Sequence, residues 1–140
     1  MRLSLQTDYA LRALLFVASR SGRTTVADIA EFYGISIHHV GKVVHQLGRF
    51  GYVRNRRGPG GGIELARKPA EIVVGRVILD FEGNMHLLPC VTHEGECVIQ
   101  PGCTLRGVLA EAERRQIDYL NGITLEALLP TPLNLSVFKG

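Results

Sequence analysis

Three cysteines, Cys90, Cys97 and Cys103, stand within a stretch of 14 residues and are the first side chains here that could carry chemistry. Thiolates are soft ligands that favour zinc and iron–sulfur clusters over hard cations. An odd number of cysteines cannot be used up by disulfides within one chain, so a metal or redox role is the better hypothesis. Neither gap is as short as the C-x2-C pairs typical of structural zinc, whereas three thiolates in one loop could hold three corners of an iron–sulfur cluster.

This spacing leaves the fourth ligand and the kind of metal open. His86 and His93 are close to the cysteines in the sequence, and they suit either metal site or are simply exposed loop residues. Three idle thiols are a further alternative, which their clustering in a polar loop disfavours. A thiol enzyme is also disfavoured, because the sequence offers no acid to orient a histidine beside a nucleophilic cysteine. We therefore predict that the protein is not an enzyme.

A second set of residues suits contacts with a polyanion. Arg54, Arg56 and Arg57 come directly before a glycine-rich run over residues 58–62, which includes Gly60. Guanidinium groups bind phosphates in bidentate fashion, and a glycine-rich backbone can approach a phosphate or enter a minor groove. A nucleotide-binding loop is disfavoured, since no helix begins after the glycines and no Lys-Ser/Thr pair follows. The segment predicts a DNA-binding wing rather than a flexible hairpin with incidental arginines.

Upstream of these arginines lies a segment with the pattern of a DNA-reading helix. Its apolar face is predicted to consist of Ile37, Val40, Val43, Val44 and Leu47. A recognition helix carries short donors and acceptors near its N-terminus, where they reach base edges in the major groove. The outward positions that we expect to contact DNA are Ser36, His38, His39, Lys42 and His45.

Capping signals and periodicity predict the elements that position these residues. We expect helices over residues 7–19, 26–33 and 36–48. Their expected N-caps are Thr7 or Asp8, Thr25 and Ser36. Asp28 completes a capping-box pattern with Thr25, and Gly34 ends the second helix. With strands over residues 51–54 and 63–65, the pattern is that of a winged helix-turn-helix.

Beyond the hairpin the helical period resumes, with a short helix ending at Gly83 and a long helix from about Thr104 to Leu120. We divide the chain into three parts. Residues 1–82 form a winged helix-turn-helix DNA-binding domain with the following helix, and residues 83–103 form a cluster-binding cysteine loop. Residues 104–140 form a dimerisation helix and a C-terminal segment. The predicted fold class is mainly α with a small β-hairpin.

Composition narrows the class of protein. Of 140 residues, 46% are hydrophobic and 21% are charged, as in globular proteins. The longest apolar run covers residues 13–18, far below the roughly 20 residues that cross a bilayer, and Asp8 and Arg12 interrupt any signal peptide. We therefore expect a cytoplasmic protein without membrane contact. Residues 1–67 hold ten Lys and Arg against four acids, and residues 68–140 hold six against nine, which predicts a polyanion-binding half joined to another unit.

Several independent motifs together resemble one known family. The motifs are Thr7-Asp8-Tyr9-Ala10-Leu11-Arg12-Ala13-Leu14, the helix over residues 35–47, Arg56-Arg57-Gly58-Pro59-Gly60-Gly61-Gly62, and three cysteines before Leu105. They are similar to those of the bacterial iron–sulfur winged-helix repressors of the NsrR, IscR and RirA type, over nearly the whole chain. The segment from Cys97 to Leu109 looks most like the nitric-oxide-sensing NsrR branch, because Arg106 stands where the IscR branch has a histidine.

The resemblance implies a cofactor and its ligands. In the NsrR branch an N-terminal aspartate of the partner subunit can complete a [4Fe–4S] cluster, and the matching residue is Asp8. Arg12 and Glu82 match positions beside that aspartate and cluster. The implied cofactor is an iron–sulfur cluster, with [4Fe–4S] favoured and [2Fe–2S] as the alternative. Its implied ligands are Cys90, Cys97, Cys103 and Asp8.

The resemblance also implies a function. The expected protein is a homodimeric transcriptional repressor that binds an inverted-repeat operator in double-stranded DNA and is controlled by its cluster, with nitric oxide as the signal. A regulator of the same fold that senses iron supply or redox state is the nearest alternative. A zinc-binding protein, a thiol-reactive protein and a cluster-free interaction protein are more distant ones.

Overall fold

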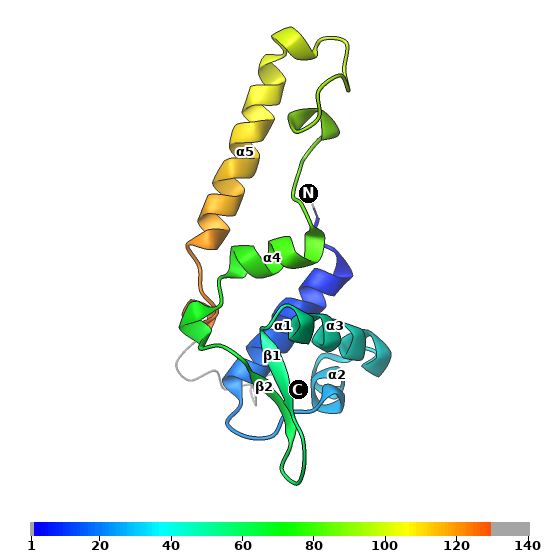
Figure 1. Ribbon diagram of the computed structural model, residues 1–140, viewed down its shortest axis with the longest axis vertical. Helices are drawn as coiled ribbons and strands as arrows, with labels where there is room; N and C mark the ends of the chain where they lie inside the picture. The colour runs from blue at the N-terminus through cyan, green and yellow to red at the C-terminus, as the bar shows by residue number, and fades with distance from the viewer. Residues whose placement is uncertain (1, 130–140) are drawn as a thin grey trace.

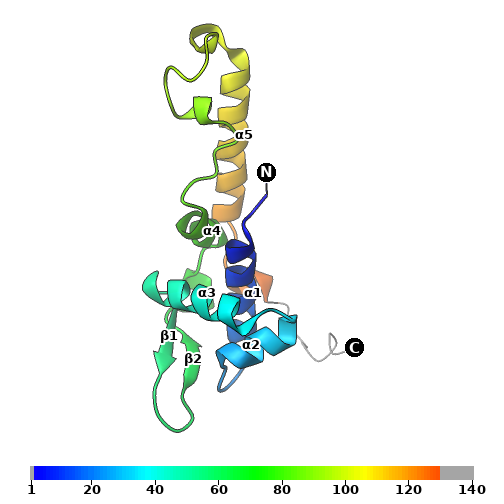
Figure 2. The same ribbon diagram turned by 90° about the vertical axis from the view of Figure 1, so that its right-hand side faces the viewer.

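The computed structural model describes residues 2–129 and has two parts, a head and an arm (Figures 1 and 2). The head contains α1 (Leu5–Ser19), α2 (Val26–Tyr33), α3 (Ile37–Arg49), β1 (Val53–Arg56) and β2 (Gly62–Leu65). The arm contains α5 (Thr104–Asn121) and the loop of residues 83–103, and α4 (Val74–Glu82) lies between the two parts. This architecture confirms the predicted fold class, mainly helical with one antiparallel hairpin.

Short 3-10 turns occur in the segments between and after the main helices and strands. They are Pro69–Glu71, Pro89–Val91, Gln100–Gly102 and Glu126–Leu128. The hairpin and the start of α5 lie at opposite ends of the long axis of the molecule (Figure 1). In a single protomer, the predicted DNA-reading elements and the cysteine loop are therefore far apart.

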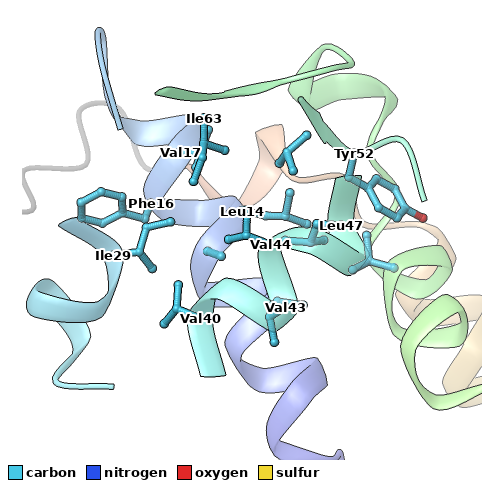
Figure 3. Close-up of a cluster of buried hydrophobic side chains, with 14 of the residues drawn as sticks. Leu14, Phe16, Val17, Ile29, Val40, Val43, Val44, Leu47, Tyr52 and Ile63 are labelled. Carbon is cyan, nitrogen blue, oxygen red and sulfur yellow. The ribbon is translucent and has the colours of Figure 1, made fainter. Parts of the chain in front are cut away.

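An apolar core between α1, α3 and the hairpin holds the head together (Figure 3). Leu14 of α1 and Leu47 of α3 are fully buried, and Tyr52 and Ile63 cover them from the side of the hairpin. Burial of one leucine side chain contributes about 1.5–3 kcal/mol, so a core of this kind is sufficient to fix the positions of the helices.

The first helix begins earlier than the sequence predicted. Ser4 is its N-cap, and the Ser4 hydroxyl accepts a hydrogen bond from the Thr7 amide at 3.3 Å. The prediction that Thr7 or Asp8 caps this helix is therefore wrong. Thr7 is instead buried within the first turn, where its hydroxyl donates a hydrogen bond to Glu82 of α4.

The turn between α2 and α3 follows the predicted pattern more closely. Thr25 and Asp28 form a reciprocal capping box, and Gly34 ends α2 in the left-handed region at φ +64°. Ser36 occupies the N-cap position of α3, but its hydroxyl forms no capping bond. Ile37 was predicted to face the core and is 51% exposed, because the buried face of α3 begins one turn later.

The hairpin is shifted relative to the prediction, since β1 begins at Val53 rather than at residue 51. Gly51 has a φ of +77° and belongs to the turn that leaves α3. In the glycine loop, a Cβ atom on Gly61 would overlap the Arg56 carbonyl oxygen, so this position requires glycine. The Ile63 amide donates a hydrogen bond of 2.7 Å to the Thr24 carbonyl, which braces the hairpin against the α1–α2 connection.

The base of the arm is anchored to the head by main-chain hydrogen bonds. The Val74 amide donates to the Ile123 carbonyl at 2.9 Å, and the Leu125 amide donates to the Ile72 carbonyl at 2.8 Å. Where α4 meets the end of α5, a Cβ atom on Gly75 would lie 2.9 Å from the Asn121 main-chain nitrogen. Glycine is therefore required for this close approach.

The rest of the arm buries few side chains. Along α5, Leu105, Val108 and Tyr119 are 57%, 63% and 72% exposed. These three apolar side chains of the predicted dimerisation helix are thus open to solvent in the single chain. The predicted C-terminal segment of residues 130–140 lies outside the described residues. Within residues 2–129, no helix has both the length and the apolar character needed to cross a membrane.

Candidate DNA-binding surface and cysteine loop

The residues that we expect to contact DNA lie on the outward face of α3 and at its N-cap position. All five are exposed: Ser36, His38, His39, Lys42 and His45. The His39 ring stacks on the Tyr9 ring of α1, with a centroid separation of 6.3 Å and an angle of 29° between the planes. This contact links the first turns of α1 to the predicted recognition helix.

The hairpin presents the predicted arginines to solvent, together with Gly60. Arg54 is ion-paired with Glu64 across the two strands, with 2.7 Å between Nε and Oε1. Arg56 and Arg57 form no ion pair with any of residues 2–129, so their charge is better suited to a phosphate.

A groove of about 430 Å³ at the base of the hairpin adds two arginines that the sequence analysis missed. Arg20 and Arg23, from the connection after α1, line this groove together with Arg56. The Arg20 guanidinium lies 4.6 Å from the centroid of the Phe16 ring, which restricts the direction of its side chain. The excess of positive charge in residues 1–67 is the sequence signal that could have pointed to these two arginines, because both lie in that half of the chain.

The cysteines all lie in the arm as free thiols. Cys97 is exposed, and Cys90 and Cys103 are half-buried. Within residues 2–129, no three His, Cys, Asp or Glu side chains are placed so that they could hold a metal ion. The single chain therefore does not bring the predicted cluster ligands together.

Both candidate histidines have other partners. His86 Nδ1 lies 3.1 Å from an oxygen of Glu113 in α5, and the Leu87 amide donates to the other Glu113 oxygen at 2.5 Å. His93 Nδ1 lies 3.1 Å from the Thr92 hydroxyl oxygen. No pattern in the sequence marks Glu113, whose carboxylate binds His86 and the Leu87 amide and so holds the start of the cysteine loop against α5.

Gln100 was also missed and is the most constrained side chain in the cysteine loop. It is 8% exposed, and its amide forms hydrogen bonds with the main chain at Cys90, His93 and Gly95. No periodicity marks it, because it is a polar residue that bonds to main-chain groups of an irregular loop.

Of the three charged residues that the family resemblance implies, Asp8 and Arg12 lie on α1 of the head, and Glu82 is the last residue of α4. Asp8 forms a bidentate ion pair with Arg12, with both nitrogen–oxygen distances at 2.9 Å. Glu82 accepts hydrogen bonds from the Ser4 amide at 2.7 Å and from the Thr7 hydroxyl. The Thr7 bond is the main cause of the lowered pKa of Glu82. In the single chain, Glu82 thus joins α4 to α1 through Ser4 and Thr7.

The donor set of the cysteine loop fits an iron–sulfur cluster in its chemistry. Three free thiols in one loop supply the soft ligands that iron–sulfur clusters require. A carboxylate such as Asp8 could supply a fourth, more weakly bound ligand. Because Asp8 and the cysteines form no metal-holding group within residues 2–129, such a site needs a second protomer or a rearranged loop.

A winged-helix head with an exposed basic hairpin defines the class of DNA-binding regulators. Residues 3–131 match the family model Rrf2, described as an iron-dependent transcriptional regulator. The chain belongs to this Rrf2 family of transcriptional regulators.

Individual relatives agree with this assignment. The chain is 44% identical over 132 residues to the HTH-type transcriptional regulator NsrR of Geobacillus kaustophilus, covering 92% of this chain and 90% of the relative. Identity to NsrR of Bacillus subtilis is 40%, with the same coverage.

Solved structures show the same fold. CymR, the global cysteine regulator of B. subtilis, superposes with a TM-score of 0.76 at 25% identity, covering 91% of this chain and 95% of that one. The corresponding values for T. potens IscR are 0.75 and 25%, covering 94% of this chain and 88% of that one.

Proposed function

We propose that this protein is a homodimeric repressor whose affinity for operator DNA is set by an iron–sulfur cluster and falls in the presence of nitric oxide. The observation that carries the proposal is the pairing of a basic winged-helix head with three free cysteines in a separate arm. The NsrR relatives support it, since they match over almost the whole chain.

Dimer formation is supported by the surface of α5. This helix has 18 residues and buries none of its side chains in the single chain. Leu105 and Val108 are exposed one turn apart, which is the spacing of an apolar helix–helix seam. A second copy of α5 would cover these residues, and the two heads would then meet the two halves of an inverted repeat.

The cluster would be held by Cys90, Cys97 and Cys103 of one protomer and by Asp8 of the other, and we favour [4Fe–4S]. Such a cluster supplies iron that reacts with nitric oxide. The ligand from the partner makes the relative placement of the two protomers depend on the state of the site. Asp8 would exchange its bidentate pairing with Arg12 for a shared interaction with the site.

The contacts of α1 provide a route from Asp8 to the recognition helix. Tyr9, the next residue, stacks on His39 of α3. The Tyr33 hydroxyl at the end of α2 donates a hydrogen bond of 3.2 Å to the Arg12 carbonyl. A displacement of the first turns of α1 would therefore act on both helices of the helix-turn-helix, which gives the switch its two-state element.

The decisive experiment is a titration of protein purified without oxygen. We expect visible absorbance and a native mass that correspond to a cluster, and a dimer. Stepwise addition of nitric oxide should bleach the absorbance and weaken operator binding in parallel. A colourless protein that binds one zinc ion would refute the cluster, and operator binding that ignores cluster loss would refute the coupling.

The role of Asp8 is tested by Asp8→Ala, with Asp118→Ala on the exposed face of α5 as the matched control. Asp8→Ala should leave the circular dichroism spectrum of the folded protein unchanged and shorten the lifetime of the cluster under a chelator at least fivefold. The control should behave as the wild type does. An unchanged lifetime in Asp8→Ala would remove this residue from the site.

Iron sensing by the same fold is the second candidate, and the description of the family as iron-dependent favours it. One part of the titration distinguishes an iron sensor from a nitric oxide sensor. An iron sensor should lose operator binding when iron is limited and keep it when nitric oxide is added at doses that leave the cluster absorbance intact. A nitric oxide sensor should respond at near-stoichiometric doses.

A further inference from the structure

Gln100 contacts the main chain of all three cysteine residues, although it stands between the second and the third. Its side-chain Nε2 donates to the Cys90 carbonyl at 3.0 Å. Its own amide donates to the Cys97 carbonyl at 3.1 Å, and its carbonyl accepts from the Cys103 amide at 3.3 Å. Residue 100 is therefore bonded to the main chain at all three cysteines, through the glutamine side chain at Cys90 and through its own main chain at Cys97 and Cys103.

The side-chain amide of Gln100 forms two further hydrogen bonds with the main chain of the loop. Nε2 also donates to the His93 carbonyl at 2.5 Å, and Oε1 accepts from the Gly95 amide at 2.6 Å. The side chain thus bonds to main-chain groups of Cys90, His93 and Gly95, which span six residues. No buried side-chain nitrogen or oxygen in residues 2–129 lacks a hydrogen-bond partner, so this amide is buried without an unsatisfied polar atom.

Burial singles out the same residue. Of residues 83–121, all of which the structure describes, Gln100 alone is buried. This segment has no apolar core that could define the path of its loop. The loop is instead organised around one amide, which supplies two donated hydrogen bonds and one accepted one.

We propose that Gln100 is the positioning residue that holds the main chain of the three cysteines together in one loop, from which their thiolates bind the iron–sulfur cluster. This inference rests on the proposed function. Holding the three backbones in one loop before the cluster binds lowers the main-chain part of the ordering cost of assembly, and the thiol side chains take up their ligand positions when the cluster binds. It also slows the loss of the cluster, because a thiolate that detaches stays close to its iron.

Two variants separate the hydrogen bonds from the volume of the side chain. Gln100→Met removes all three side-chain bonds at similar size. Gln100→Glu keeps an acceptor for the Gly95 amide but sets carboxylate oxygens against the Cys90 and His93 carbonyls. The matched control is Gln116→Met, on the exposed surface of α5.

The first measurement uses the full-length protein without cluster and needs no cofactor. Amide hydrogen exchange should be at least tenfold faster at Gly95 in Gln100→Met, because this amide donates to Gln100. Exchange in α1 and α3 should match that of the wild type, which shows that the head remains folded. Gln116→Met should show no change in either region.

The second measurement follows the reconstituted cluster. Both Gln100 variants should lose the cluster to a chelator at least fivefold faster than wild type and show an altered visible circular dichroism spectrum, whereas Gln116→Met should not. Wild-type lifetime and spectrum in both Gln100 variants would overturn the proposal. A wild-type protein that takes up no cluster would overturn the proposed function instead, and the exchange measurement would then decide separately whether Gln100 orders this loop.

Discussion

In the head, side chains from three helices and the hairpin are buried in one apolar core, whereas between residues 83 and 121 only Gln100 is buried. The head is specified by hydrophobic burial, which is cooperative and spread over many contacts. The structure of the arm instead depends on the main-chain hydrogen bonds at its base, on the hydrogen bond that Glu113 accepts from the Leu87 amide, and on the hydrogen bonds of Gln100.

The arm is therefore the part of the molecule that is better suited to respond to a signal. A region with few buried contacts opens locally at a low free-energy cost, and sensing elements are commonly drawn from such regions. The head can keep its DNA-reading geometry while the arm changes. In the proposed dimer, a change in the arm of one protomer would reach the head of the other through Asp8 on α1. Within one protomer, α4 lies between arm and head, and the Thr7–Glu82 hydrogen bond joins it to α1.

The sharpest test makes the same substitution in both regions. Leu47→Ala removes a fully buried side chain from the core of the head and should lower the free energy of unfolding by about 2–5 kcal/mol. Leu105→Ala, on exposed α5, should lower it by no more than about 0.5 kcal/mol at a concentration where the protein is monomeric. Urea unfolding followed by circular dichroism measures both.

Leu105→Ala should instead weaken self-association, which sedimentation at several concentrations detects. Equal destabilisation by the two leucine substitutions would show that the arm shares the core of the head, and the comparison would fail.

The second prediction concerns the joint between head and arm. Gly75→Ala places a methyl group against the Asn121 main chain and should cost about 1–3 kcal/mol through overpacking. The loss should appear as faster exchange of the Val74 amide, which donates to the Ile123 carbonyl, and of the Leu125 amide, which donates to the Ile72 carbonyl. Gly107→Ala is the control, since a Cβ atom there meets no neighbour. Unchanged exchange in Gly75→Ala would show that the joint tolerates separation.

The sequence predicted the head well where a local pattern decides the structure. The capping box of Thr25 and Asp28 and the stop at Gly34 lie within ten residues and need no distant partner. The prediction for α1 failed because Ser4, Thr7 and Asp8 could each cap a helix. Glu82, 75 residues from Thr7, selects among them by bonding to Thr7 and Ser4.

The arm was less predictable because its structure, like the start of α1, depends on hydrogen bonds between residues that are not neighbours in the sequence. Its cysteines could be found from residue type and spacing, but Gln100 and Glu113 could not. Periodicity reports apolar burial, whereas these two side chains bond to main-chain groups whose positions depend on the folded loop. The sequence therefore revealed the candidate ligands and missed the residues that hold them.

The third prediction compares arginines of the two regions in DNA binding. Arg56→Ala should weaken operator affinity about tenfold, or about 1.4 kcal/mol, and reduce the slope of log affinity against log salt by about one. Arg115→Ala, on α5 and paired with Glu111, should change neither. Fluorescence anisotropy over a range of salt concentrations measures both. An equal loss in Arg115→Ala would place DNA contacts on the arm as well.

The smallest predicted effect tests the link between the two regions. Glu82 accepts hydrogen bonds from α1, chiefly from Thr7, and its pKa lies below its ordinary value of 4.5. Its charged form is therefore favoured in the folded state, and the resulting stability is present above that ordinary value and is lost as pH falls through the lowered pKa.

Glu82→Gln keeps an acceptor oxygen and removes the charge, so it should cost about 1 kcal/mol at pH 7. The difference from the wild type should shrink as pH falls below 4.5, whereas Glu126→Gln, an exposed control, should show no such trend. Urea unfolding of cluster-free protein at several pH values gives both curves. A difference that is constant with pH would mean that the carboxylate charge plays no part in holding α4 to α1, and that packing and uncharged hydrogen bonds join the two helices.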